Sequence, residues 1–441
     1  MYLSDGKMAL VPKMIIFSSI MMLGIISIIA TDGNGGNNGG GLAPTISALS
    51  FNPTAVYVND GGGQIIVNGS INFSDPDGDL STVTINIMDA AGTIVATEVN
   101  TIIGMTGVTS GIIQGTVTVS TTTAGYFTVQ IFATDNHSLR SNQLEGTFRI
   151  AEFPWVAKSP MPTPRLKFAA ANIGGLIYVI GGQDASALIT PKPPMTTMEI
   201  YNPTNDSWST GPSMLVALSG SMAAVVNGKL YIIGGQPDGG LASDAVQEYD
   251  PALQTWSMKT SMPDACHSAA VATHNGLIYV AGGQGPGVDL NSLLWFSPAT
   301  DSWSAGSPMH QSRIDPAAAD IDGRIIVYGG YDSTHIPDGG YLGSVESYDP
   351  VMDTWSARTS GSPRRDVGVT IFNGLMYTFG GNNVERALDW VQAYDNAADA
   401  WLNKTSMPVR LGYARAEVIN DKIFVFGTDE TLEYTPSNDI M

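Results

Sequence analysis

Three aspartates occupy alternate positions in the loop Asp75-Pro76-Asp77-Gly78-Asp79, and a fourth, Asp135, ends a later apolar run. Converging carboxylates suit Ca²⁺, which takes about six to eight oxygen ligands. The loop is not an EF-hand, because the twelfth position counted from Asp75 is Asn86 rather than Glu. Two interpretations stay open: a calcium site made of Asp75, Asp77, Asp79 and Asp135, or a solvated Asp/Pro/Gly turn.

A second set of candidate residues is tied to glycine pairs that recur in the C-terminal part of the chain. The pairs are Gly181-Gly182, Gly234-Gly235, Gly282-Gly283, Gly329-Gly330 and Gly380-Gly381, with a degenerate sixth at Gly427-Thr428. Sixteen residues before each first glycine stand Arg165, Leu218, Cys266, Arg313, Arg364 and Leu411, and two of these are flanked by Arg365 and Arg410. A guanidinium binds a carboxylate through two parallel hydrogen bonds, so these arginines predict an anionic ligand or pairing with a neighbouring repeat.

Other candidates share this register. The residues that follow glycine pairs are Gln183, Gln236, Gln284 and Tyr331, and His267 follows Cys266. We count them with Arg165, Arg313, Arg364, Arg365 and Arg410 as candidate ligand-binding residues. Cys266 is expected to be a small, semi-buried residue rather than a nucleophile, and the five histidines show no shared ligand spacing. The sequence assigns no catalytic residue.

Other residues at fixed distances from the glycine pairs predict the strands and turns that position these candidates. Each glycine pair ends a short apolar strand, and a turn such as Asn227-Gly228 or Asp322-Gly323 lies seven residues before it. Such dipeptides accept the left-handed conformations of two-residue β-hairpins. Each aromatic residue that follows precedes a tryptophan by seven positions, in the pairs Tyr201/Trp208, Tyr249/Trp256, Phe296/Trp303, Tyr348/Trp355 and Tyr394/Trp401. The recurrence predicts a repeat protein made of small antiparallel sheets.

This combination resembles the kelch repeat, as in the central domain of galactose oxidase, over Trp155 to Tyr434. The resemblance implies an all-β propeller with one four-stranded blade per repeat, in which glycine pairs let neighbouring backbones approach closely. Six glycine strands accompany five complete aromatic pairs, which leaves Trp155 at the front and Tyr434 at the back. We therefore predict a six-bladed propeller over residues 151–441, closed where these two strands pair. A seventh blade would need a repeat that the sequence does not show.

Residues 44–150 predict a β-sandwich, because short alternating runs are separated there by Gly, Asn and Asp. The runs are 64–73, 82–88, 93–99, 116–120, 126–134 and 147–150. Tyr126 suits the tyrosine corner of immunoglobulin-like folds. The acidic loop resembles those of bacterial cadherin-like and immunoglobulin-like surface modules, so an immunoglobulin-like domain is expected.

The N-terminus predicts export, because Lys7 and Lys13 precede an uncharged apolar stretch from Met14 to Ala30. Its 17 residues would span about 26 Å as a helix, so a membrane tether through residues 14–30 stays open beside a cleaved signal peptide. Residues 1–30 are assigned to this segment and 31–43 to a Gly/Asn-rich linker. We expect an extracellular, periplasmic or cell-surface location.

Charge and cysteine content exclude several function classes. Lys plus Arg is 20 and Asp plus Glu is 40, and the net charge of −20 argues against nucleic-acid binding. A single cysteine excludes an intrachain disulfide and a cysteine-rich zinc site.

Loop lengths indicate where a ligand would bind. Only the segment between each glycine pair and the next aromatic varies in length, and 183–200 and 331–347 are the longest such segments. Repeat proteins place such insertions on their binding face. We therefore predict an exported or surface-tethered protein that binds a glycan or protein at the propeller funnel, with no cofactor in the propeller.

Two other functions stay open. The resemblance includes enzymes that act on sugars, namely sialic-acid mutarotases and galactose oxidase. The latter uses copper, tyrosines and a Tyr–Cys crosslink, for which Cys266, His267, His310 and Tyr331 would be the candidates. The remaining alternative is a structural surface protein whose propeller only displays loops.

Overall fold

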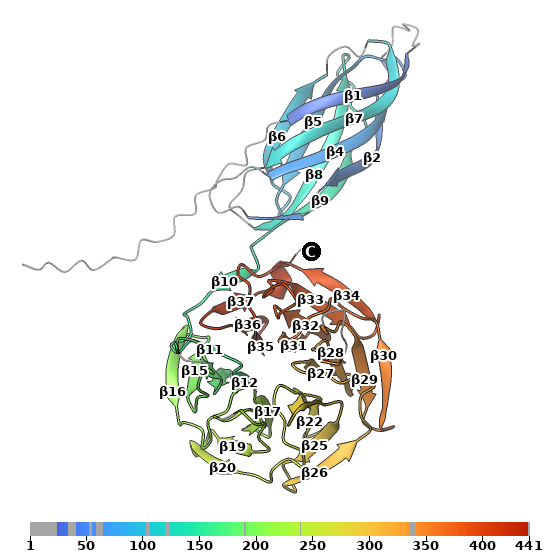
Figure 1. Ribbon diagram of the computed structural model, residues 1–441. Coiled ribbons are helices and arrows are strands. Elements are labelled where there is room, and N and C mark those ends of the chain that lie inside the picture. The colour runs from blue at the N-terminus through green and yellow to red at the C-terminus, as the bar shows by residue number, and fades with distance from the viewer. Residues whose placement is uncertain are drawn as a thin grey trace, which may run out of the picture. The chain divides into compact units, whose positions relative to one another are not determined.

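The computed structural model describes residues 24–33, 41–52, 55–58, 65–102, 106–119, 124–188, 191–238, 240–334 and 340–439. The chain divides into two compact units, with the division between Phe153 and Pro154 (Figure 1). The described residues are almost entirely β-strands and connections, and the one helical turn among them is η1 (Pro436–Asn438). The all-β fold class is therefore confirmed.

Two packed sheets form the N-terminal unit. The four-stranded sheet has the order β1 (Gly24–Gly33), β7 (Val108–Val119), β4 (Ile65–Ser74) and β2 (Thr45–Asn52). The five-stranded sheet has the order β3 (Ala55–Tyr57), β9 (Leu144–Ala151), β8 (Gly125–Asp135), β5 (Leu80–Met88) and β6 (Ile94–Thr101). Ile71 and Ile113 of the first sheet share one buried cluster with Ile85 and Ile131 of the second. Alternation along these strands thus supplies a common apolar core.

The expected tyrosine corner is wrong. Such a corner needs a tyrosine hydroxyl that bonds back to the main chain. Tyr126 is instead 63% exposed, and the guanidinium of Arg149 lies 5.7 Å from the centre of its ring. This tyrosine therefore lies on the surface of its sheet.

Part of the apolar N-terminal segment belongs to a sheet. Residues 14–23 of the predicted signal or anchor lie outside the described residues, but Gly24–Gly33 form β1 and extend into the predicted linker. β1 pairs antiparallel with β7, with Ile28 opposite Ile113. Among the described residues, no helix is long and apolar enough to cross a membrane.

The second unit contains six four-stranded antiparallel sheets among its described residues, arranged in a ring (Figure 1). Sheet 1 contains β12 (Ala169–Ile173), β13 (Leu176–Ile180), β15 (Met198–Asn202) and β16 (Ser207–Gly211). Sheet 2 contains β17 (Met222–Val226), β18 (Lys229–Ile233), β19 (Val246–Asp250) and β20 (Thr255–Met258). Sheet 3 contains β21 (Ala270–His274), β22 (Leu277–Ala281), β25 (Leu293–Ser297) and β26 (Ser302–Gly306).

The remaining sheets repeat this plan. Sheet 4 contains β27 (Ala317–Ile321), β28 (Arg324–Tyr328), β29 (Val345–Asp349) and β30 (Thr354–Arg358). Sheet 5 contains β31 (Gly368–Phe372), β32 (Leu375–Phe379), β33 (Val391–Asp395) and β34 (Ala400–Lys404). Sheet 6 contains β35 (Arg415–Ile419), β36 (Lys422–Phe426), β37 (Thr431–Tyr434) and β10 (Trp155–Ala157). Two short ladders join β11 (Arg165–Leu166) to β14 (Gln183–Asp184) and β23 (Gln284–Gly285) to β24 (Val288–Asp289).

The ring is continuous at its centre. The first strand of each sheet contacts the first strand of the next, and β35 of sheet 6 contacts β12 of sheet 1. Sheet 6 joins both ends of the unit, since Trp155 in β10 pairs with Tyr434 in β37. The predicted pairing of these two strands is confirmed.

The tryptophans anchor the outer strands. In sheets 1–5 each predicted aromatic and tryptophan face each other on adjacent strands, with ring centres 5.0–5.1 Å apart. Each indole N–H donates to the segment that leads into its own sheet, as from Trp208 to the Ser159 carbonyl at 3.0 Å. In sheet 6, Trp155 donates to the Thr405 carbonyl at 3.1 Å. These hydrogen bonds and ring contacts explain the fixed spacing in the sequence.

The glycine pairs connect neighbouring sheets. The N–H of Gly235 donates to the carbonyl of Cys266 in the next repeat at 2.9 Å. A Cβ on Gly234, whose φ is +58°, would lie 2.3 Å from that carbonyl oxygen. Any side chain at this position would therefore push the two sheets apart, so the predicted role of the glycine pairs is confirmed.

We expect Gly234→Ala to reduce the free energy of unfolding by about 3 kcal/mol or more, because it adds a clash to an unfavourable φ. Gly228→Ala is the matched control, since Gly228 also has a positive φ but a Cβ there meets no atom within 4 Å. The control should lose only about 1–2 kcal/mol. Urea unfolding checks both values, and equal losses would contradict the role given to Gly234.

Candidate functional site

A short segment, which we call the strap, precedes the first strand of each sheet. It begins fifteen residues before the first glycine of that sheet, as at Leu166 in sheet 1, and it carries several of the predicted residues. In sheets 2–5 the strap residue fifteen positions before the first glycine pairs through its backbone with the residue directly after the glycine pair. The pairs are Ser219/Gln236, His267/Gln284, Ile314/Tyr331 and Arg365/Asn382, and Leu166/Gln183 is their counterpart in sheet 1. The structure therefore brings Gln183, Gln236, Gln284, Tyr331, His267 and Arg365 to one register of the ring.

The next strap residue of each sheet, fourteen positions before the first glycine, lines the cavity at the centre of the ring. We call this cavity the channel, and its end at the straps the channel mouth. These six mouth residues are Lys167, Gly220, Ser268, Asp315, Asp366 and Tyr413, and their φ values are all between 52° and 62°. From Gly220 to Asp366, each donates its N–H to the mouth residue of the preceding sheet at 2.7–3.1 Å. Non-glycine residues rarely adopt this conformation, and such backbone strain is concentrated at functional sites.

A cavity of about 190 Å³ lies inside the ring, between the six first strands. Small residues such as Ala170, Ala223 and Ala318 form much of its wall. Its charged lining residues are Lys167, Asp315, Asp366, Arg415 and Glu417. None of these five was singled out from the sequence.

Asp366 has the most perturbed environment at the mouth. It is 5% exposed, and Nδ2 of Asn382 donates to its Oδ2 at 3.1 Å. Burial and repulsion from Asp315 raise the pKa of Asp366 to about 8, although Arg365 and Arg415 attract its charged form. A carboxyl with a pKa near neutrality can both donate and accept a proton, so Asp366 is the acid–base candidate. Burial also raises the pKa of Glu417, deeper in the channel, to about 8.

Arg365 lies at the same mouth between carboxylates and aromatic rings. Its Nη1 is 3.8 Å from Oδ2 of Asp315, and its Nε is 3.6 Å from Oδ2 of Asp366. Its guanidinium carbon lies 5.0 Å from the ring centre of Tyr331 and 5.6 Å from that of Tyr341. Since 29% of the Arg365 side chain is exposed, a ligand can reach this cation–π cluster.

Three predicted arginines do not enter the funnel. Arg165, Arg313 and Arg364 are completely buried, and each donates to the carbonyl of the first glycine of its own sheet. Their third-strand partners are Glu199 at 2.7 Å, Glu346 at 2.9 Å and Gln392 at 3.1 Å. The expectation that these three line the funnel is corrected, because their buried guanidinium groups bind the second and third strands of their own sheet. Arg410, by contrast, is exposed.

Sheet 6 has an apolar pair of residues where sheet 1 has the buried pair of Arg165 and Glu199. Leu411 and Leu432 of sheet 6 occupy the positions that Arg165 and Glu199 occupy in sheet 1, and they pack in one buried cluster. Replacing a buried ion pair by well-packed apolar residues is often neutral for stability. Because leucines occupy the equivalent positions in sheet 6, we infer that the arginines at these positions contribute to packing inside the sheets.

Among the described residues, the remaining sulfur and histidine candidates belong to no cluster of metal ligands. Cys266 is 3% exposed, and burial raises the pKa of its thiol to about 12, which makes it unreactive. Burial lowers the pKa of His267. Nδ1 of His310 lies 2.7 Å from Glu346, and His335 lies outside the described residues.

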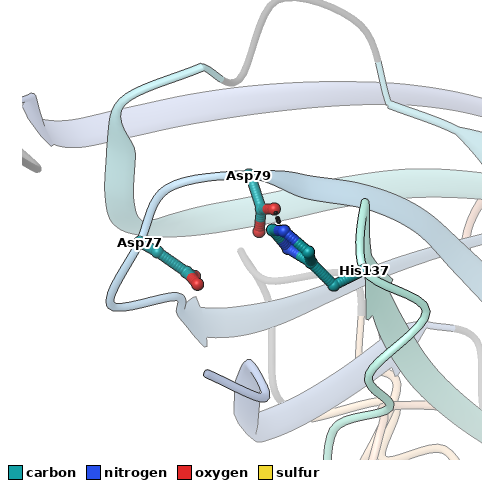
Figure 2. Close-up of side chains that lie close together, drawn as sticks. All are labelled: Asp77, Asp79 and His137. Atoms are coloured by element: carbon teal, nitrogen blue, oxygen red, sulfur yellow. Dashed lines mark ion pairs between the residues drawn. The ribbon is translucent and has the colours of Figure 1, made fainter. Parts of the chain in front are cut away.

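The acidic loop of the N-terminal unit lies beside the turn that follows β8. Ligand atoms of Asp77, Asp79 and His137 lie within 4.8 Å of one another, the one such cluster found in the described part of the chain (Figure 2). Nδ1 of His137 is 2.8 Å from Oδ2 of Asp79. Asp75 and Asp135 are 0% and 2% exposed, and burial together with the neighbouring Asp77 raises the pKa of Asp75 to about 6. The sequence identified the four aspartates but not His137.

Comparison with known proteins agrees with this architecture. A family model described as the Attractin/LZTR1 beta-propeller matches residues 147–383, and the kelch motif matches residues 363–408. Kelch-like protein 25 of Xenopus tropicalis is 24% identical over 292 residues, which are 64% of this chain and 41% of that protein. Kelch-like protein 23 of Homo sapiens is 28% identical over 235 residues, which are 53% of this chain and 38% of that protein. The chain thus spans about two fifths of the length of these curated relatives.

One solved structure, titled "Structure of YjhT", is 15% identical with a TM-score of 0.48, and the match covers 64% of this chain and 94% of that one.

The buried arginine pairs predict strong non-additivity. We expect Glu199→Leu alone to reduce the free energy of unfolding by about 3–5 kcal/mol, because it leaves the Arg165 charge buried without its partner. The double variant Arg165→Leu/Glu199→Leu should recover most of that loss, since it copies Leu411 and Leu432. Urea unfolding of the three proteins checks this double-mutant cycle, and a double variant less stable than Glu199→Leu would contradict it.

The raised pKa of Asp366 predicts that stability falls with pH. A carboxyl whose folded-state pKa is raised contributes stability below its unfolded pKa, near 3.8, and loses it as the pH rises through about 8. We expect a loss of up to about 1.4 kcal/mol per pH unit across this window, which Asp366→Asn should reduce. Urea midpoints measured across the window check this. Asp322→Asn, at an exposed hairpin turn, is the control and should leave the wild-type slope unchanged.

Proposed function

This chain belongs to the Attractin/LZTR1 β-propeller family, and on that premise we propose that it is a binding protein that recognises a protein partner at the channel mouth. One observation carries the proposal: the Arg365 guanidinium lies against the rings of both Tyr331 and Tyr341, which also contact each other, and it remains partly exposed. Arginine and tyrosine are the side chains most enriched in the energetic centres of protein interfaces.

The net charge of the chain favours a partner with a basic surface. At the cluster itself, Asp315 and Asp366 lie within 4 Å of the Arg365 guanidinium, and the raised pKa of Asp366 leaves Asp315 as the carboxylate that Arg365 neutralises near pH 7. The whole chain carries a net charge of −20, so a basic partner surface would also be steered toward it. A glycan is the other ligand that tyrosine faces can stack against, and it is an outcome of the test below.

The finer architecture is part of the proposal. The six sheets would be the blades of a closed six-bladed propeller, which the contacts between β12 and β35 support. The N-terminal unit would be an immunoglobulin-like spacer, which its two packed sheets support. Export would follow from the apolar segment after Lys7 and Lys13.

One observation favours an enzyme as the second candidate. Asp366, with a pKa near 8, adjoins Asp315 in the channel, and a carboxyl that titrates near neutrality is typical of acid–base catalysis. A sugar mutarotase of the kind suggested by the kelch resemblance needs only such groups. NMR of sialic-acid anomerisation would reveal this activity, and its loss in Asp366→Asn would assign it to this site.

We expect Arg365→Ala to weaken partner binding by about 30-fold or more, as for the centre of an interface. Arg324→Ala is the control, because Arg324 begins β28 at the end opposite the glycine pair and pairs with Asp349 at 3.1 Å. Full-length wild type and both variants would be screened against a protein array and a glycan array at equal folded concentration.

Protein spots retained by Arg324→Ala but lost by Arg365→Ala would support the proposal. Glycan spots with that same pattern would identify a sugar ligand instead. Binding that is unchanged in Arg365→Ala would overturn the site.

A further inference from the structure

We propose that Asp75, Asp77, Asp79 and Asp135 form a calcium site where the β4–β5 loop meets the turn after β8. The site lies within the N-terminal unit and is independent of the binding function proposed for the propeller.

The two innermost carboxylates are each held by one oxygen and left unpaired at the other. Oδ2 of Asp75 accepts the N–H of Leu80 at 2.7 Å. Oδ1 of Asp135 accepts the N–H groups of His137 and Leu139, both at 2.8 Å. The second oxygen of each, Oδ1 of Asp75 and Oδ2 of Asp135, is buried and has no hydrogen-bond partner. Both side chains are almost completely buried, at 0% and 2% exposed, so bulk solvent does not reach these oxygens.

The two outer carboxylates repeat this arrangement. Oδ2 of Asp77 accepts the N–H of Leu42 at 2.8 Å, and Oδ2 of Asp79 faces Nδ1 of His137 at 2.8 Å. Oδ1 of each aspartate is again buried without a partner. Figure 2 shows the Asp79–His137 pair and Asp77 on the same loop. Each of the four aspartates thus carries one buried, unpaired oxygen, and a carboxylate oxygen of Asp77 lies within 4.8 Å of one of Asp79 and of a ring nitrogen of His137.

The fold places these four residues next to one another. Leu80, which follows the loop, pairs with Asp135 in the β5–β8 ladder. The N–H of Asn136 donates to the carbonyl of Asp79 at 3.1 Å. Burial and the nearby carboxylate of Asp77 together raise the pKa of Asp75, as expected for neighbouring carboxyl groups. The β4–β5 loop and the turn after β8, which are about 55 positions apart in the sequence, are therefore adjacent.

A cation explains why these oxygens stay unpaired. Buried polar atoms in native proteins are nearly always hydrogen-bonded, and a buried carboxylate without compensation is strongly unfavourable. Among the described ion pairs, the only one that reaches the four aspartates is with His137, which is 56% exposed. Main-chain N–H groups orient one oxygen of three of the aspartates, which leaves the other oxygens free to bind a metal ion.

The donor set favours Ca²⁺ over other divalent ions. All four free ligands are carboxylate oxygens, the donors preferred by Ca²⁺, which tolerates irregular geometry and lets water complete its shell. Mg²⁺ demands a near-octahedral arrangement and Zn²⁺ prefers nitrogen and sulfur ligands. A Zn²⁺ site would instead depend on His137, and the variants below separate these cases.

Bound Ca²⁺ would join three segments of the unit: the chain at Leu42, the β4–β5 loop and the turn after β8. Hydrogen–deuterium exchange of the full-length chain, with 1 mM CaCl₂ or with EDTA, reports on each segment. We expect Ca²⁺ to slow exchange at least tenfold in peptides containing residues 42, 77–80 and 136–139. Titration calorimetry should give one Ca²⁺ per chain with a dissociation constant of about 10⁻⁵–10⁻³ M.

Asp75→Asn and Asp135→Asn test the ligand assignment, with Asp89→Asn as the matched control. Asp89 is also an aspartate of this unit that accepts main-chain N–H groups in a turn, from Ala91 at 3.0 Å and Thr93 at 2.9 Å. We expect Asp75→Asn to abolish Ca²⁺ binding but to leave the protein in EDTA at least as stable as wild type. The asparagine keeps an acceptor for Leu80 and removes repulsion from Asp77. Asp89→Asn should bind Ca²⁺ as wild type does.

Three results would overturn the proposal. These are no Ca²⁺ binding to wild type, undiminished binding to Asp75→Asn, and tighter binding of ZnCl₂ that is lost in His137→Ala. If Asp75→Asn or Asp135→Asn does not fold, Asp77→Asn decides the question, because Asp77 is only partly buried.

Discussion

The main-chain hydrogen bond from the second glycine of one repeat to a carbonyl of the next repeat sets the spacing of the ring. In sheets 1–5 this N–H···O distance is 2.7–2.9 Å, which leaves no room for a Cβ on the first glycine. The carbonyl belongs to the residue just before the strap. The contact therefore also fixes where each strap lies and which residue faces the channel. Packing between sheets and the composition of the mouth thus depend on one backbone contact.

The spacing of the arginines in the sequence did not predict which of them are buried. Arg364 and Arg365 are consecutive, yet the first is completely buried and the second contacts Tyr331 and Tyr341. Successive side chains of an extended segment point in opposite directions, so a register that is correct to within one residue can assign the wrong face. The recurring tryptophans were predictable, because their partners lie seven residues away in the same sheet. Asp366 was not, because its pKa is raised by burial and by Asp315, which comes from the neighbouring sheet. Counting fourteen residues back from each first glycine, rather than sixteen, would have identified both.

In the N-terminal unit, hydrophobicity alone did not predict the structure of the apolar segment. An apolar stretch predicts a signal peptide, a membrane anchor or a buried strand with equal force, and Gly24–Gly33 form a strand beside β7. The four aspartates were recognisable because three of them alternate within five residues. His137 was not, because only the pairing of β5 with β8 brings it to the loop.

Sheet 6 can form only after nearly the whole second unit has been synthesised, because it contains strands from both ends of that unit. Its outer strand β10 leaves the ribosome first, but its partner β37 follows 279 residues later, counted from Trp155 to Tyr434. At about 5–20 residues per second, the β10 edge waits for roughly 15–55 s before its own sheet exists. During that interval its unpaired N–H and C=O groups can pair with other chains, so the unfinished edge is an aggregation hazard until β37 has been made.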